Sequence, residues 1–191
     1  MSIGFACRCG AVEIDMPGCA PRHGSHLICY CKDCRAFARH LGADDMLLDH
    51  GGNRIFQTRP DWVRVVKGKE HLRALRLSPK GLVRWYAGCC STPMFATGGR
   101  PKVPFIGFAG GAAMDVGALG PEIALGFTAS ALDPPTGMKD RGLAKLGWRF
   151  AKRTLPGMVT GAAKRNPFFE GDRPIAKPEL ISKEARAAAT V

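Results

Sequence analysis

HLICYCKDCR, residues 26–35, carries three cysteines on one short turn. The apolar residues at its start predict a strand over residues 26–30 that runs straight into the cysteines. After the turn, Phe37 and Leu41 lie four residues apart and Gly42 follows, which predicts a short helix over residues 33–41. The three cysteines therefore fall where a strand gives way to a helix, a common place for a metal-binding knuckle.

The other cysteines are also clustered. The 191 residues contain eight cysteines, and only Cys19 stands alone. The clusters are Cys7 and Cys9; Cys29, Cys31 and Cys34; and Cys89 and Cys90. We find no apolar run long enough to span a membrane and no leader, and we therefore expect a cytoplasmic protein. Because the cytosol is reducing, clustered thiols there indicate zinc binding rather than disulfides.

The number of ligands decides what each zinc site does. A structural zinc has four protein ligands, whereas a catalytic zinc has three and one open position. Cys29, Cys31 and Cys34 supply three thiols, and His23 or His26 would close the site if either joined them. The Cys7-x-Cys9 pair needs partners, for which Cys89 and Cys90 are the remaining clustered thiols. The alternative for these four is that they are buried small apolar residues.

The rest of the chain predicts a mainly β fold with a helical C-terminal extension. Four short runs separated by turn residues predict an antiparallel meander over residues 54–57, 62–66, 72–77 and 82–86. The composition changes after Pro134 and Pro135, so we expect a zinc-binding domain over residues 1–133 and an extension over residues 134–191. Residues 141–155 predict an amphipathic basic helix stopped by Pro156, and residues 179–189 a second short helix.

Positive charge is concentrated in two stretches of the chain. The net charge is +12, and residues 54–84 hold nine basic and two acidic residues while residues 136–165 hold eight and one. Such stretches suit acidic small molecules, nucleic acid or an anionic membrane surface. We expect the helix over residues 141–155 to pack on the β domain. The alternatives are that this helix lies on an anionic membrane or that it covers the zinc site as a lid.

The cysteine motifs together resemble a known family. They are Cys7-Arg8-Cys9-Gly10, Cys29-Tyr30-Cys31-Lys32-Asp33-Cys34-Arg35, and Arg84-Trp85-Tyr86 leading to Cys90-Ser91-Thr92-Pro93. In order and spacing they are similar to the glutathione-dependent formaldehyde-activating enzymes, which share a domain with centromere protein V. The resemblance implies a β-tent fold of small antiparallel sheets around zinc knuckles. It also implies a structural zinc held by the outer motifs and a catalytic zinc held by Cys29, Cys31 and Cys34.

The chain departs from that family in its last motif. The family has Cys-x-x-Cys-Gly, and the alignment puts Ala87 where the first cysteine belongs and Ser91 where the glycine belongs. Cys89 is the available substitute, although neighbouring cysteines seldom reach one metal without a distorted peptide. Three alternatives follow for the site formed by the outer motifs. Its metal has three ligands plus Cys89, or three ligands plus water, or the site holds no metal.

The resemblance implies a zinc-dependent carbon-sulfur lyase that handles a thiol adduct such as S-hydroxymethylglutathione. Glutathione carries two carboxylates, and arginine binds carboxylates in bidentate pairs. Among the arginines we expect Arg35 to bind substrate, because it directly follows the metal turn. The alternative is a non-catalytic zinc module that binds an anionic partner, either a membrane surface or nucleic acid. Nucleic acid is the less favoured partner, because the tryptophans form no stacking row.

Overall fold

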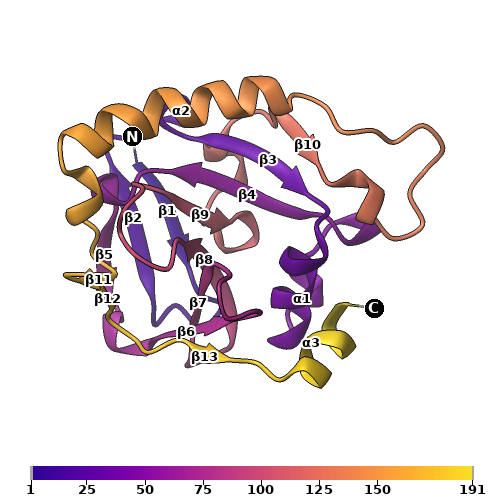
Figure 1. Ribbon diagram of the computed structural model, residues 1–191, viewed down its shortest axis with the longest axis horizontal. Helices are drawn as coiled ribbons and strands as arrows, with labels where there is room; N and C mark the ends of the chain where they lie inside the picture. The colour runs from indigo at the N-terminus through magenta and orange to yellow at the C-terminus, as the bar shows by residue number, and fades with distance from the viewer. Residues whose placement is uncertain (1, 191) are drawn as a thin grey trace.

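The computed structural model describes residues 2–190, and the chain begins with a hairpin (Figure 1). Strand β1 (Ser2–Ala6) pairs antiparallel with β2 (Glu13–Pro17), and β5 (Arg64–Lys67) joins the other side of β2. Apolar and polar residues alternate along both hairpin strands, so that Ile3, Phe5, Ile14 and Met16 are buried. The turn between the two strands carries the first cysteine pair.

An eight-stranded sheet forms most of the molecule. Its order is β10-β3-β4-β9-β8-β7-β6-β13, antiparallel except for the parallel edge pairs β10–β3 and β13–β6. The bounds are β3 (Ser25–Cys29), β4 (Asn53–Thr58), β6 (Leu72–Arg76), β7 (Val83–Ala87), β8 (Thr92–Thr97), β9 (Ile106–Ala109), β10 (Ala124–Gly126) and β13 (Glu179–Leu180). Strands β11 (Phe169–Glu170) and β12 (Arg173–Pro174) form a separate pair. The mainly β fold class is thus as predicted.

The predicted meander is wrong in its pairing although all four strands exist. Strand β4 pairs with β3 and β9, while β5 leaves this sheet to pair with β2. Only β6 and β7 are neighbours as expected. The Pro60–Trp62 segment forms a 3-10 turn that carries the chain from one sheet to the other, rather than a hairpin turn.

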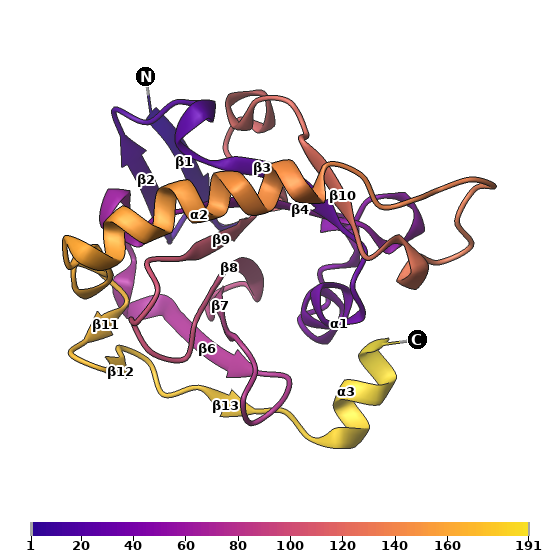
Figure 2. The same ribbon diagram turned by 45° about the horizontal axis from the view of Figure 1, so that its top comes forward.

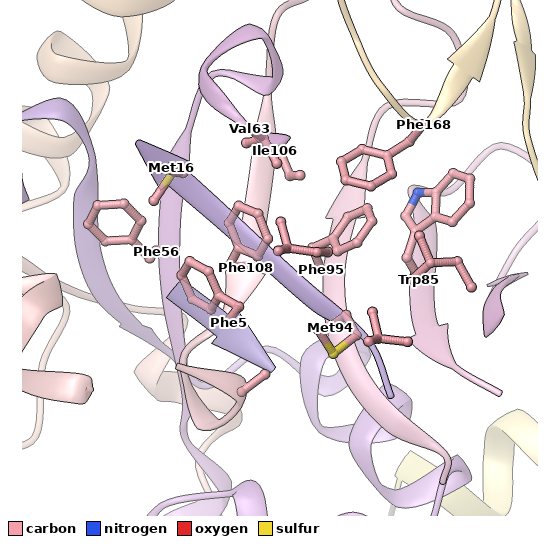
Figure 3. Packing of buried hydrophobic residues seen from close by; sticks show 14 of the residues in the cluster. Phe5, Met16, Phe56, Val63, Trp85, Met94, Phe95, Ile106, Phe108 and Phe168 are labelled. Carbon is pink, nitrogen blue, oxygen red and sulfur yellow. The ribbon is translucent and has the colours of Figure 1, made fainter. Parts of the chain in front are cut away.

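The main core fills the space between the sheets with aromatic side chains (Figure 3). Phe5 and Phe108 stack with ring centroids 4.0 Å apart, and Phe95 lies 5.5 Å from Phe108. Trp85 is fully buried, and its indole N–H donates a 3.0 Å hydrogen bond to the hydroxyl of Thr97. A buried indole with a satisfied N–H makes this strand a rigid base for the cysteines that follow it.

Three α-helices flank the sheets. Helix α1 (Lys32–His40) follows β3, α2 (Leu143–Val159) lies along β10, β3 and β4, and α3 (Lys183–Thr190) packs on α1 (Figures 1 and 2). Shorter 3-10 helices connect the strands: η1 (Pro21–His23), η2 (Asp44–Met46), η3 (Asp49–Gly51), η4 (Pro60–Trp62), η5 (Lys69–His71), η6 (Gly110–Ala112), η7 (Val116–Leu119), η8 (Thr128–Ser130) and η9 (Ala162–Lys164).

Helix α2 packs on the sheet, and it is longer than predicted. Its inner face places Phe150 against Phe105, with ring centroids 5.8 Å apart, and buries Thr154. Pro156 lies inside the helix and does not stop it, contrary to our prediction. Proline has no N–H, so Pro156 cannot donate a hydrogen bond to the carbonyl of Lys152. Lys152 is exposed, so water can bind that carbonyl instead.

The C-terminal extension contributes to the main core. Phe168 is fully buried beside Phe95, at a centroid distance of 4.2 Å, and beside Trp85, at 5.8 Å. Strand β13 then completes one edge of the large sheet. The division at residue 133 stays a prediction about domains, but the two segments share one hydrophobic core. Within residues 2–190, no helix is long and apolar enough to cross a membrane.

Candidate metal centres

Four thiols from two distant turns form the first cluster. Cys7 and Cys9 lie on the β1–β2 turn, and Cys89 and Cys90 lie on the β7–β8 turn. The turn at Cys9 closes through Gly10, which has a φ of 71° and donates its N–H to the carbonyl of Cys7 at 2.9 Å. The four sulfurs lie within 4.8 Å of one another. The structure thus brings together all four predicted ligands of the outer motifs.

The spacing of these sulfurs suits one tetrahedral ion. The Cys7–Cys9 and Cys9–Cys89 sulfur distances are 3.5 and 3.4 Å. The Cys7–Cys89 and Cys89–Cys90 distances are both 3.9 Å. Four thiolates around one zinc at about 2.3 Å would lie about 3.8 Å apart. The donor set therefore fits a closed metal site.

The peptide at Cys89 and Cys90 explains how neighbouring cysteines reach one site. Ala87 is fully buried at the end of β7, and the N–H of Cys90 donates to its carbonyl at 3.3 Å. Ser91 then takes a φ of 54°, a left-handed conformation that is unusual for a residue other than glycine. This tight turn brings the sulfurs of both Cys89 and Cys90 to the same group as those of Cys7 and Cys9.

Hydrogen bonds fix the sulfurs of this cluster. The N–H of Val12 donates to Cys7 Sγ at 3.2 Å, and Thr92 Oγ1 lies 3.1 Å from Cys90 Sγ. Burial tends to raise the pKa of the Cys90 thiol, but hydrogen bonds from Thr92 and from Cys9 outweigh burial and lower the pKa to about 6. A lowered pKa favours the thiolate, which is the form that binds metal.

The second cluster lies at the β3–α1 junction, as the sequence predicts. Cys29 ends β3 and is buried, Cys31 is the N-cap of α1, and Cys34 lies in the first helical turn. Their sulfurs lie within 4.8 Å of one another. The N–H of Cys34 donates to Cys31 Sγ at 3.3 Å, so the sulfur caps the helix. The partial positive charge of the helix N-terminus favours thiolates here.

The thiols of this cluster share their protons unequally. Hydrogen bonds from Cys29 and then Cys34 lower the pKa of the Cys31 thiol. The pKa of Cys29 is raised, first by its hydrogen bonds to Cys31 and Cys34 and then by burial. The cluster therefore holds one negative charge readily and releases further protons when a cation binds it.

Neither candidate histidine joins this cluster. His23 Nδ1 accepts the N–H of Ala20 at 2.9 Å, and His26 Nδ1 lies 2.7 Å from the carbonyl oxygen of Gly120. Within residues 2–190, no fourth histidine, cysteine or carboxylate joins Cys29, Cys31 and Cys34. Three protein ligands leave one coordination position for another molecule.

The structure does not support the substrate-binding role that we expect of Arg35. Its side chain is buried and donates to the carbonyl of Ser130 at 2.9 Å and of Thr190 at 3.2 Å. It therefore ties α1 to two distant segments, and it lies near enough to Cys31 for the charge of that thiol to act on it. The charge of Arg84, on β7, also favours the thiolates of Cys31 and Cys34, although the hydrogen bond with Cys31 and burial leave the pKa of Cys34 raised, to about 11.

Further cations gather at the start of α1. Asp33 lies 4.0 Å from Arg84 and 2.9 Å from Arg186 of α3. A cavity of about 500 Å³ opens beside these residues, with Lys32, Lys183 and Arg186 in its lining. The sequence does not indicate that Lys183 and Arg186 lie near this site, because they reach it only through the packing of α3 on α1.

Comparison with known proteins identifies the family. No curated protein matches the chain. A crystal structure of a Rhodobacter sphaeroides protein from structural genomics is similar at 21% identity and a TM-score of 0.40, covering 62% of this chain and 96% of that one. A family model described as a family of unknown function, DUF6151, matches residues 1–179. Because that match spans nearly all of the chain, the protein belongs to the DUF6151 family.

Proposed function

We propose that this protein is a zinc-dependent, carbon-sulfur lyase-like enzyme that handles a thiol adduct such as S-hydroxymethylglutathione. In this proposal Cys29, Cys31 and Cys34 hold the catalytic zinc. Cys7, Cys9, Cys89 and Cys90 hold a structural zinc. The substrate class comes from the resemblance to the glutathione-dependent formaldehyde-activating enzymes, and the geometry of the second cluster is compatible with it.

The observation that carries the proposal is the difference between the two clusters. The first has four thiols, as a closed structural site does, and the second has three. Neither His23 nor His26 lies in the group of ligand atoms that the second cluster forms. An open position is what a catalytic site needs and a purely structural site does not.

The chemistry expected at the open position needs no redox partner. A zinc ion with thiolate ligands supplies a place where a substrate thiol loses its proton more easily. In the forward direction a carbon-sulfur bond forms between the thiol sulfur and the aldehyde carbon, and the thiol proton ends on the carbonyl oxygen. The reverse reaction cleaves the same bond, so atoms and electrons balance in both directions.

The surrounding residues support binding of an anionic thiol. Three thiolates would give the centre a net negative charge, and the charge of Arg84 offsets part of it. Lys32 and Lys183 line the adjacent cavity, where their ammonium groups suit the carboxylates of a glutathione-like molecule. These side chains replace Arg35 in the role that we expected of it.

The test combines metal content with the reaction itself. We expect purified protein to accelerate exchange between formaldehyde, glutathione and their adduct, as measured by NMR exchange spectroscopy. Cys31→Ala should abolish the acceleration and remove one zinc. Cys19→Ala is the matched control, because Cys19 lies outside both clusters. If zinc-loaded protein does not accelerate the exchange, the proposed substrate is wrong. If Cys31→Ala keeps its full zinc content, the proposed catalytic zinc site is wrong.

A further inference from the structure

A second cavity, lined by cations and tryptophans, lies on the outer side of the molecule between α2 and the turns η1 and η4. Its volume is about 520 Å³, within the usual range for small-molecule sites. Trp148 of α2 and Trp62 of η4 line it, together with lysines and arginines of α2, η1 and the residue before η4. None of these side chains belongs to the two cysteine clusters.

Most of the positive charge in this cavity has no counter-charge. Arg59 is paired with Asp61 through hydrogen bonds of 2.9 and 2.6 Å. The other cations have no carboxylate within 4.0 Å among residues 2–190; they are Arg22, Lys145, Arg149, Lys152 and Arg153. Like charges gathered in one cavity repel one another, and an anion bound there would remove that cost.

Two of these arginines are held in place by neutral acceptors. Arg149 Nη2 donates to the carbonyls of Gly24 at 2.7 Å and Arg22 at 3.2 Å. Arg153, one helical turn further, donates from Nη1 to Ser25 Oγ at 2.8 Å. Burial and then the charge of Arg149 lower the pKa of Arg153 to about 10. The two guanidinium groups are thus positioned before any ligand binds, which lowers the ordering cost of binding.

The aromatic rings give the cavity an apolar surface beside the charges. Trp148 is 63% exposed, and Lys152 Nζ lies 5.0 Å from its ring centroid. The Arg59 guanidinium lies 4.7 Å from the Trp62 ring centroid, and His23 meets the same ring edge-on at 5.6 Å. Trp148 is thus an exposed indole beside a cation, whereas Trp62 is half-buried under Arg59. An exposed indole next to cations is an arrangement on which a nucleobase stacks while phosphates bind nearby.

We propose that this cavity binds a nucleotide. Its base would stack on Trp148 or Trp62, and its phosphates would lie against Arg22, Lys145 and Arg149. An anionic membrane is less favoured, because Trp62 and Arg59 lie in the lining of the cavity, which a flat surface does not enter. The proposal is independent of the reaction proposed for the cysteine clusters, and either can fail without the other.

Tryptophan fluorescence offers a direct test with ADP, adenosine and inorganic phosphate as probes. The chain has three tryptophans, and Trp85 is fully buried, so quenching reports on Trp62 and Trp148. We expect ADP to quench saturably, adenosine to bind at least about tenfold more weakly, and added salt to weaken ADP binding. Trp148→Phe should remove a large part of the signal.

A pair of charge variants tests the cavity itself. Lys145→Gln with Lys152→Gln removes two exposed cavity cations, and we expect ADP binding to weaken at least about tenfold. Lys80→Gln with Lys102→Gln changes the net charge equally outside the cavity and should leave binding unchanged. Zinc content should be the same in both variants.

Three results would overturn the proposal. The first is the absence of saturable quenching by ADP. The second is equal ADP affinity in the two double variants. The third is binding to phosphatidylglycerol vesicles, or to a thymidine oligonucleotide, that is lost in the Lys145→Gln, Lys152→Gln variant but that ADP does not displace. That last result would assign the surface to a lipid or to single-stranded nucleic acid.

Discussion

The sulfur of Cys9 lies 3.4 Å from the sulfur of Cys89, a residue 80 positions further along the chain. This contact joins the β1–β2 turn to the β7–β8 turn and therefore links the three-stranded sheet to the eight-stranded one. A metal ion bound there would crosslink two parts of the fold that lie far apart in the chain.

Replacing Cys89 should therefore remove one metal ion and lower stability together. We expect elemental analysis to find one zinc fewer in Cys89→Ser than in the wild type. We also expect this variant to unfold at a lower urea concentration, because the crosslink is lost. Cys19→Ala, a thiol outside both clusters, should keep both ions. Unchanged zinc content in Cys89→Ser would show that three thiols suffice for the first site.

Removing the charge of Arg84 should weaken metal binding at the second cluster. The charge of Arg84 favours the thiolates of Cys31 and Cys34, so Arg84→Met should lower zinc affinity there by about tenfold or more. Competition with a chromophoric chelator measures the affinity. Arg76→Met, whose guanidinium binds the carbonyls of Pro79 and Gly81, is the control. Equal affinities would mean that Arg84 only packs against Phe37.

Arg35 should matter for stability and not for binding. Its charged hydrogen bonds to Ser130 and Thr190 are buried, so Arg35→Ala should lower the free energy of unfolding by about 2 kcal/mol or more. Arg39→Ala removes an exposed ion pair with Asp44 and should cost less than about 1 kcal/mol. Urea unfolding measures both. A near-zero cost for Arg35→Ala, with altered substrate KM, would restore the substrate-binding role.

Phe168 should be as important as any aromatic residue of the β sheets. It is fully buried, so Phe168→Ala should lower the free energy of unfolding by about 3–5 kcal/mol. Val159→Ala, at a side chain that is 90% exposed, should change it by less than about 0.5 kcal/mol. If chemical denaturation gives similar values for both variants, the extension is not part of the cooperative unit.

Asp140 should contribute stability that depends on pH. The Thr128 N–H, at 2.8 Å, and then its hydroxyl, at 2.7 Å, donate to Asp140 Oδ1 and lower the pKa of that carboxyl. Because the pKa is lower in the folded state, the contribution is complete above about pH 4 and is lost as pH falls through the folded value. Thr128→Val should raise the pKa of Asp140 in an NMR titration, and an unchanged pKa would contradict this account.

The local elements of the second cluster could be predicted from the sequence. Strand β3, the turn and α1 follow from short-range apolar spacing, and the three cysteines lie within six residues of one another. The capping role of Cys31 is an observation of the structure, because the helix begins one residue earlier than predicted. Local spacing places residues on an element, and here the element also forms the site.

Long-range relationships could not be predicted in the same way. Strand β5 could be predicted as a strand, but its partner could not. It pairs with β2, some 50 residues earlier, where Val65 lies opposite Ile14. Arg35 is buried by Ser130 and Thr190, which lie 95 and 155 residues away. No local pattern records which distant segment will cover a given face.

The pairing of β13 with β6 sets an order of events during synthesis. Leu75 on β6 is opposite Glu179 on the edge strand β13, so this side of β6 has no partner until residue 179 has been synthesised. An uncovered strand edge can recruit an edge of another chain. Forms of the chain that end before residue 179 would therefore expose the edge of β6, which β13 covers in the structure.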